Sequence, residues 1–238
     1  MKYAIAMLLV GGVMVRSASA EIIITTDTTL DFFIGLREGP VIIRDGPAGP
    51  TTVDIVDGAN IQPGVIAKER SVLNLRGGIT ERGVGGNDQS TINIFGGLVG
   101  GEDVVVRGQS TANIYGGIFG DDISAEDSAV VNLYGGTFEK AGNGASLGVS
   151  EDGVINVFGS NFVIDPDPPG SPLPRLQGVL SDGSPLDVFL NIFDANSGIT
   201  QIVLHEIPEP SAFCLCSIGL FLLLVYRRPL REGRDDSF

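Results

Sequence analysis

The chain has very few of the residues on which many catalytic and redox sites depend. Its 238 residues include one histidine, two cysteines and no tryptophan. A single histidine excludes a metal site built from several histidine ligands. Both cysteines, Cys214 and Cys216, lie in one apolar segment near the C-terminus, so disulfides do not stabilise the rest of the chain. The glycine pairs are not followed by the Lys-Ser/Thr of a phosphate-binding loop.

Basic residues are scarce as well. The chain has 15 Lys and Arg against 29 Asp and Glu, a formal net charge of −14. Nucleic-acid binding needs clustered Lys and Arg, so we expect no nucleic-acid partner. The acidic surplus is typical of a solvated extracellular surface, or of one that holds divalent cations. Helix-forming segments are missing from the middle of the chain, which favours an all-β domain.

One short sequence is written three times between Ser90 and Gly136. Each copy has the order apolar, Asn, apolar, aromatic, Gly, Gly, and weaker copies lie at 71–78 and 153–160. The repeated asparagines are Asn74, Asn93, Asn113, Asn132 and Asn156, which are 19, 20, 19 and 24 residues apart. A period of this length is typical of solenoid proteins.

The apolar positions on both sides of each asparagine are two residues apart, so in a strand they share one face. We expect these columns to point inward and stack, and the glycine pair to end the strand. A second short strand is expected around Val99, Phe119, Phe138 and Phe162, and a third at 104–106 and 145–149. The prediction is a parallel β-solenoid (β-helix) with coils of about 20 residues. The alternative is an antiparallel sandwich of short strands.

The segments outside the repeat complete the predicted organisation. Residues 21–70 are expected to form irregular first coils or an N-terminal cap, and residues 71–164 the regular solenoid. Prolines between Asp165 and Pro174 break the repeat, because proline cannot donate to a β-ladder. Residues 165–206 are therefore expected to form a break followed by C-terminal strands or a cap.

The first 20 residues have the features of a secretory signal peptide. Lys2 supplies the positive charge, an apolar helix is predicted from Tyr3 to Val15, and Ala18-Ser19-Ala20 is a small-x-small cleavage site. We expect cleavage after Ala20, with Ala18 and Ala20 as the recognised small residues. The alternative is an uncut N-terminal membrane anchor.

The C-terminus carries three features in a fixed order. Pro208-Glu209-Pro210 comes first, the uncharged apolar run 212–226 follows, and Arg227 and Arg228 begin a basic tail. The run is predicted to be a short transmembrane helix, with the arginines on the cytoplasmic side. Residues 207–238 resemble the PEP-CTERM sorting signal of bacterial exported proteins. The resemblance implies an exosortase as processing partner and cleavage near the Pro-Glu-Pro motif. It also implies transient membrane tethering, followed by release or a cell-surface location. The middle of the chain is loosely similar to Gly-Gly repeat regions of surface proteins.

An aromatic column is the first candidate site. Two residues after the asparagines lie Phe95, Tyr115, Tyr134 and Phe158, which would face outward about 4.8 Å apart. Such a row could stack against sugar rings and bind polysaccharide. The alternative interpretation is structural, because asparagine rows and aromatic stacks also stabilise β-helices without a ligand.

Acidic pairs in the loops are the second candidate site. Carboxylates on successive coils could bind Ca²⁺, and Asp103, Asp121, Asp122 and Asp127 are the candidate ligands. Solvated loops explain the pairs equally simply, so no cofactor is required. Paired carboxylates are also compatible with the active site of a glycosidase or lyase. Against an enzyme, basic residues are sparse in the repeats, and the long loops that would form a cleft are missing.

The sequence predicts an exported, non-catalytic β-solenoid of the cell surface or extracellular matrix. It would bind polysaccharide or mediate adhesion through many weak contacts along one face. One alternative is a polysaccharide-degrading lyase or glycosidase, and another is a purely structural coat component.

Overall fold

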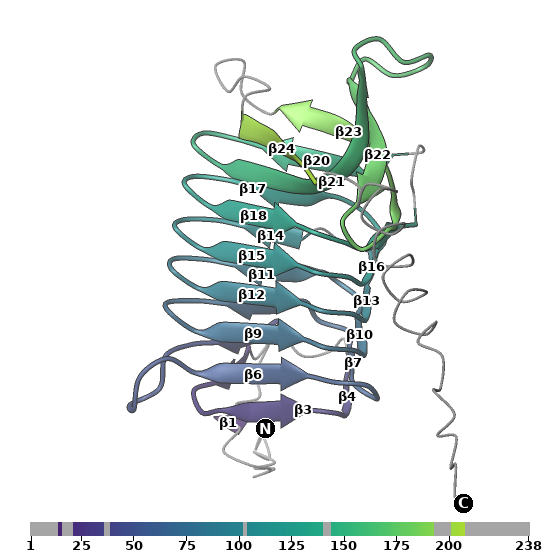
Figure 1. Ribbon diagram of the computed structural model, residues 1–238. Coiled ribbons are helices and arrows are strands. Elements are labelled where there is room, and N and C mark those ends of the chain that lie inside the picture. Colours follow the sequence, from purple (N-terminus) through teal and green to yellow (C-terminus); the bar gives the residue numbers. More distant parts are fainter. Residues whose placement is uncertain are drawn as a thin grey trace, which may run out of the picture. The chain divides into compact units, whose positions relative to one another are not determined.

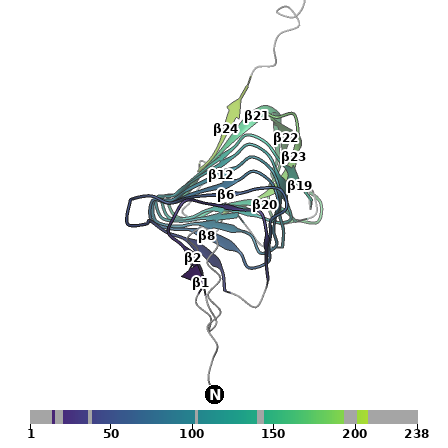
Figure 2. The same ribbon diagram turned by 90° about the horizontal axis from the view of Figure 1, so that it is seen from below.

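Three ladders of short parallel strands surround one core in the computed structural model of the protein (Figure 1). The structure describes residues 14–15, 21–35, 39–101, 104–139, 144–192 and 201–207. Equivalent positions such as Thr91 and Thr111 pair across neighbouring coils, 20 residues apart. Seen from below, the coils lie over one another (Figure 2). The predicted all-β parallel solenoid with about 20-residue coils is confirmed, and the parallel pairing excludes the antiparallel sandwich.

We name the three ladders by their surface features. The asparagine face consists of β3 (Thr28–Leu30), β6 (Thr52–Ile55), β9 (Val72–Leu75), β12 (Thr91–Ile94), β15 (Thr111–Ile114), β18 (Val130–Leu133), β21 (Val154–Asp165) and β24 (Ile202–Glu206). The groove face consists of β2 (Ile22–Ile24), β5 (Val41–Ile43), β8 (Val65–Ala67), β11 (Val84–Gly86), β14 (Val104–Val106), β17 (Ile123–Ala125), β20 (Ser146–Val149) and β23 (Pro185–Ile192). The short-strand face consists of β4 (Phe33–Ile34), β7 (Asn60–Ile61), β10 (Ile79–Thr80), β13 (Leu98–Val99), β16 (Ile118–Phe119) and β19 (Thr137–Phe138).

The core is filled by aliphatic columns that run the length of the stack. On the asparagine face, the two residues that flank each asparagine are fully buried from Leu73 and Leu75 to Ile155 and Val157. On the short-strand face, Phe119 is 1% exposed and packs against Phe138. Each such side chain contributes about 1.5–3 kcal/mol when buried, but only if the coils above and below cover it. The stack is therefore the unit of stability.

The second glycine of each pair turns the chain from the asparagine face to the short-strand face. Gly97 has a φ of +91°, a conformation that costs glycine little. A Cβ atom there would lie 2.9 Å from the carbonyl oxygens of Gly77 and Gly78 in the coil below. Glycine is thus required twice at this corner, by the backbone angle and by the close approach of two coils.

The C-terminal strands leave the coil pattern. Strand β21 extends beyond its coil and pairs antiparallel with β22 (Arg175–Leu180), which pairs antiparallel with β23. A bidentate ion pair from Arg175 to Asp187 joins β22 to β23, and hydrogen bonding to Asp187 is the main reason that the pKa of Arg175 is raised. Phe162, predicted in a second short strand, instead lies in the extension of β21, because Gly159 is followed by Ser160 and not by a second glycine, and the strand continues through a bulge between Ser160 and Val163.

At the N-terminal end, the ladders begin earlier than the regular repeat. Strand β5 pairs in parallel with β8, and β6 with β9, so the residues expected to form irregular first coils share the register of the later ones. Within the segment predicted as a signal helix, only Met14–Val15 are described. They form β1, which pairs antiparallel with β2.

By its contacts, the chain divides into two units, Met1–Glu206 and Ile207–Phe238. Only Ile207 of the second unit is described, so the predicted transmembrane helix lies outside the described residues. The part of the chain that the structure does describe holds no helix of the length and apolarity that a membrane crossing requires.

Candidate functional site

A continuous hydrogen-bonded ladder runs along the asparagine face. Each asparagine donates its side-chain N–H to the Oδ1 of its counterpart in the preceding coil, at 2.9–3.0 Å. The first of them, Asn74, donates to Oδ1 of Asp54 at 3.1 Å. All donors therefore point toward the N-terminal end, and the ladder ends there on a carboxylate, which only accepts. Arg76 supplies that carboxylate with a counter-charge at 3.0 Å.

The aromatic column beside this ladder forms a stack. The ring centroids of Phe95 and Tyr115 are 5.2 Å apart with an interplanar angle of 8°, and those of Tyr115 and Tyr134 are 5.1 Å apart at 5°. Phe158 follows at 4.4 Å and 16°. Phe95 and Tyr115 are each 44% exposed. The structure thus brings together all four aromatic residues that the sequence singled out.

The ring faces of this stack are turned toward one another. Sugars bind aromatic side chains by placing C–H groups against a ring face, where the electron density lies. Spacings of 4.4–5.2 Å leave no room for a sugar ring between neighbours. At the N-terminal end, the guanidinium of Arg76 covers the outer face of Phe95 at 4.9 Å. The exposed part of this stack therefore consists of ring edges.

His205 ends both columns and was missed by the sequence analysis. Its ring stacks on Phe158 with centroids 4.5 Å apart, and its Nε2 lies 3.0 Å from Oδ1 of Asn156. Register explains the position, because β24 pairs with β21 so that His205 is opposite Phe158. The pattern Ile202-Val203-Leu204-His205 has apolar residues at both inward positions and a ring at the aromatic position, a signal that a column-by-column alignment would have detected.

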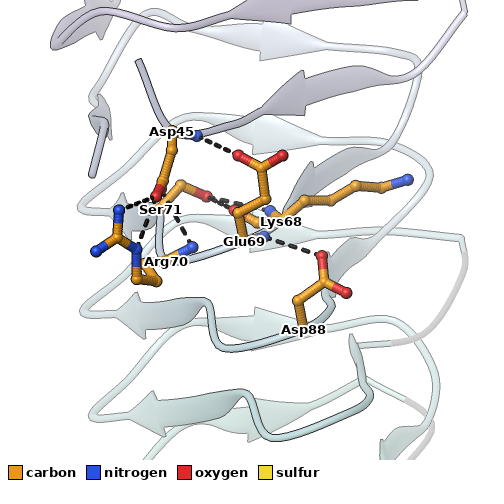
Figure 3. Close-up of polar contacts among 6 residues, drawn as sticks. All are labelled: Asp45, Lys68, Glu69, Arg70, Ser71 and Asp88. Carbon is orange, nitrogen blue, oxygen red and sulfur yellow. Dashed lines mark hydrogen bonds and ion pairs between the residues drawn. The ribbon is translucent and has the colours of Figure 1, made fainter. Parts of the chain in front are cut away.

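The acidic turns have structural roles at the corner between the groove face and the asparagine face. Four acidic residues adopt positive φ there, namely Glu69, Asp88, Asp127 and Glu151. Oδ2 of Asp88 accepts the backbone N–H of Glu69 at 3.0 Å, and the Glu69 carboxylate accepts that of Asp45 at 2.9 Å (Figure 3). Each carboxylate thus ties its coil to the previous one.

Two of the four candidate calcium ligands also accept backbone N–H groups, and the other two lie elsewhere. Oδ2 of Asp127 accepts the backbone N–H of Gly108 at 2.8 Å, and Oδ1 of Asp122 accepts that of Ser146 at 2.6 Å. Asp121 lies at the groove described below, and Asp103 lies outside the described residues. Within the described ranges, no group of three or more His, Cys, Asp or Glu side chains is placed to hold a metal ion.

A shallow groove of about 660 Å³ lies along the edge of the groove face. Its lining includes residues from the segments that lead into five successive strands, from Pro40 before β5 to Asp121 two residues before β17, so it crosses the coils. Its floor is formed by the outward residues Ile66, Gly85 and Val105. Because Gly85 has no side chain, the floor dips between its two neighbours. The sequence pattern could not reveal this groove, since it arises from one missing side chain on a face without repeats.

The residues of the predicted sorting and cleavage signals lie outside the described part of the chain. These are Pro208, Glu209, Pro210, Arg227 and Arg228 at the C-terminus, and Ala18 and Ala20 at the N-terminus. A comparison of the chain with protein-family models, with curated proteins and with solved structures found no match.

Proposed function

We propose that the chain is an exported, non-catalytic β-solenoid that acts as a rigid structural element of the cell surface or extracellular matrix. The observation that carries the proposal is the double ladder of the asparagine face. Its side-chain amides form hydrogen bonds to neighbouring coils, and its ring faces stack on neighbouring rings. The two columns run from Asp54 and Arg76 at one end to His205 at the other. A face organised in this way makes a stiff, evenly spaced surface and offers little to a reacting substrate.

The acidic residues support the same proposal. In three of the turns, a carboxylate that could have served catalysis or calcium binding accepts a backbone N–H from the preceding coil. These contacts fix each turn at its positive φ and leave the remaining oxygens to water. An acidic, hydrated surface is well suited to a protein outside the cell, since net charge far from zero keeps it soluble.

Export and sorting are proposed on the terminal segments. The contact boundary between Glu206 and Ile207 falls immediately before Pro208, where the predicted sorting signal begins. Cleavage near this motif would leave the solenoid complete through β24. We therefore propose that residues 207–238 tether the chain to the membrane until an exosortase-type enzyme removes them.

The test is expression of the full chain in a bacterium that carries such a processing enzyme. Mass spectrometry of the surface and medium fractions should find a mature protein that begins at Glu21 and ends near residue 208. Replacing Pro208 and Pro210 by alanine should leave an uncut, membrane-associated chain, while Ser211→Ala serves as the matched control. Recovery of intact 1–238 inside the cytoplasm in every case would refute export and sorting.

A second measurement separates the structural function from catalysis. The mature protein is incubated with the extracellular polysaccharide of the host, and polymer length is followed by size-exclusion chromatography. We expect no change in length over days. Shortening of the polymer would show that the chain is a degrading enzyme and would overturn the non-catalytic proposal.

A further inference from the structure

The groove face carries most of the basic residues that the structure describes. The described part of the chain holds seven Lys and Arg, and four of them border this face between β5 and β14. Those four are Arg44, Lys68, Arg82 and Arg107. In a chain with a net charge of −14, four cations gathered on one face are a local exception to the acidic surplus.

Three of the four form a column one residue beyond the strands. Arg44, Lys68 and Arg107 follow the paired ends of β5, β8 and β14, and their backbone N–H groups continue the ladder with bonds of 2.7–3.0 Å to the preceding coil. Asn87 holds the same position after β11. Coils are about 4.8 Å apart, so the column presents cations at regular intervals along the axis.

Three of these cations, Arg44, Lys68 and Arg82, have no carboxylate partner among the described residues. Arg82 is exposed at the edge of the groove, and no ion pair or hydrogen bond involves its side chain. The ammonium of Lys68 points away from the acidic turn beside it (Figure 3). Arg107 is held by Glu126 in a bidentate pair at 2.6 and 3.2 Å, which orients its guanidinium on the rim of the groove.

The groove itself has an apolar floor, and its charged lining residues are Arg82, Arg107 and Asp121, while Lys68 and Arg44 lie beside it. Ile66 and Val105 are half-buried on either side of Gly85, and the hollow above Gly85 lies between them. It spans five coils, or about 19 Å along the axis at the ladder spacing. An elongated trough with an apolar floor and a basic rim suits a linear polymer whose rings lie on the floor and whose acidic groups reach the rim.

We propose that this groove binds an acidic polysaccharide, a linear saccharide polymer that carries carboxylates such as uronic acids. The inference rests on the proposed function, because such a polymer meets the protein only outside the cell. It moves the glycan site from the aromatic stack to the groove face.

Other polymers fit the groove less well. The residues that line it include no aromatic side chain on which a nucleobase could stack. A peptide that binds as an added strand needs an unpaired sheet edge, whereas β8, β11 and β14 are each paired on both sides.

The experiment uses the full chain in mild detergent and measures its retardation in gels that contain polygalacturonate. Neutral galactan and single-stranded DNA are the comparison polymers. We expect retardation by polygalacturonate that weakens with salt, none by galactan, and little by DNA. DNA retardation equal to that by polygalacturonate would overturn the assignment to a saccharide.

Gly85→Val is the decisive variant. A Cβ at this position would lie 3.6 Å from the Ile66 side chain and 3.7 Å from the Val105 carbonyl oxygen, ordinary contact distances, so valine fills the hollow without displacing the backbone. We expect an unchanged or higher Tm together with loss of polygalacturonate binding. Binding equal to wild type in this folded variant would overturn the groove as the site.

A charge variant tests the rim separately. Lys68→Gln combined with Arg82→Gln should weaken binding about tenfold at low salt, a loss of about 1.4 kcal/mol that two solvent-screened charge contacts share. Arg70→Gln, an exposed arginine paired with Asp45 at the neighbouring corner, is the control and should bind as wild type. A protein that reaches the surface and is processed as proposed, yet shows no retardation, would overturn this inference alone. A protein that stays inside the cell would overturn the proposed function.

Discussion

Replacing Asn113 by aspartate should break the asparagine ladder at its centre. Asn113 donates to Oδ1 of Asn93 at 3.0 Å and accepts from the amide of Asn132 at 2.9 Å. Asn113→Asp keeps the acceptor and loses the donor, so two oxygens face each other where a hydrogen bond was. The same exchange in the opposite direction, Asp54→Asn, leaves the terminal acceptor of the ladder in place.

The expected magnitudes follow from counting contacts. Asn113→Ala removes two hydrogen bonds of about 1 kcal/mol each, and partial exposure of the column limits the loss to about 1–2 kcal/mol. Asn113→Asp loses one bond, adds the repulsion of a carboxylate and a carbonyl oxygen, and should cost about 2–3 kcal/mol at neutral pH. Asp54→Asn loses the exposed ion pair to Arg76, which contributes about 0–1 kcal/mol.

The pH dependence of Asn113→Asp has a defined sign. A carboxylate that faces a carbonyl oxygen is protonated more readily in the folded than in the unfolded chain, so the folded state binds the additional proton. Stability of the variant relative to wild type should therefore rise as the pH falls through the carboxyl range. Below that range the neutral acid can donate to Asn93 and part of the lost stability returns.

Urea unfolding at neutral and acidic pH, followed by circular dichroism, measures these differences. The order of destabilisation should be Asn113→Asp, then Asn113→Ala, then Asp54→Asn. If Asn113→Asp were as stable as wild type at neutral pH, or if Asp54→Asn were the most destabilised of the three, the donors would not all point toward the N-terminal end. The explanation of the terminal aspartate would then be wrong.

Three further outcomes are expected on the same scaffold. Tyr115→Ala should lower the free energy of unfolding by about 1–3 kcal/mol, because two stacked contacts disappear. Tyr115→Phe keeps the ring and should be neutral. Equal stability of both variants would contradict a stabilising stack. His205→Ala should increase hydrogen exchange of the β24 amides by roughly tenfold while the central coils stay protected, and uniform exchange would refute a local role. Gly97→Ala should cost about 1–3 kcal/mol, since φ is positive and a Cβ would meet two carbonyl oxygens, while Gly85→Ala should be neutral or stabilising; thermal unfolding distinguishes the two.

The fold could be predicted because the spacing of residues within and between the repeats determines the strands and the length of the coils. Apolar residues two apart indicate a strand with one buried face, and a fixed spacing near 20 residues places each copy over the previous one. The same reasoning failed at Phe162, because a phenylalanine at a similar spacing was treated as a repeat position although no glycine pair precedes it. The turn, and not the aromatic residue, decides where the second strand begins.

The candidate site was harder to predict, because exposure alone does not define a binding surface. The outward position of Tyr115 and Tyr134 follows from strand periodicity, but the parallel orientation of their rings depends on the χ angles that neighbouring coils impose. Asp127 was interpreted as a loop acid, and only the backbone shows that it has a positive φ and accepts the N–H of Gly108 in the preceding coil. His205 lies outside the repeat. It ends both columns because β24 returns to pair with β21 after β22 and β23, and the spacing of the repeat does not predict that pairing.

The uniform register of the coils has a consequence for how a chain of this kind can change in length. Ser90 and Ser110 occupy the same position in successive turns, and Thr91 pairs with Thr111. Excising residues 91–110 would join two equivalent points, so the backbone ladders and the inward aliphatic columns would stay in register. Duplicating the same segment would be equally well tolerated. Recombination between the repeats can therefore shorten or lengthen the stack by whole coils, in steps of about 4.8 Å, while the backbone pairing stays in register.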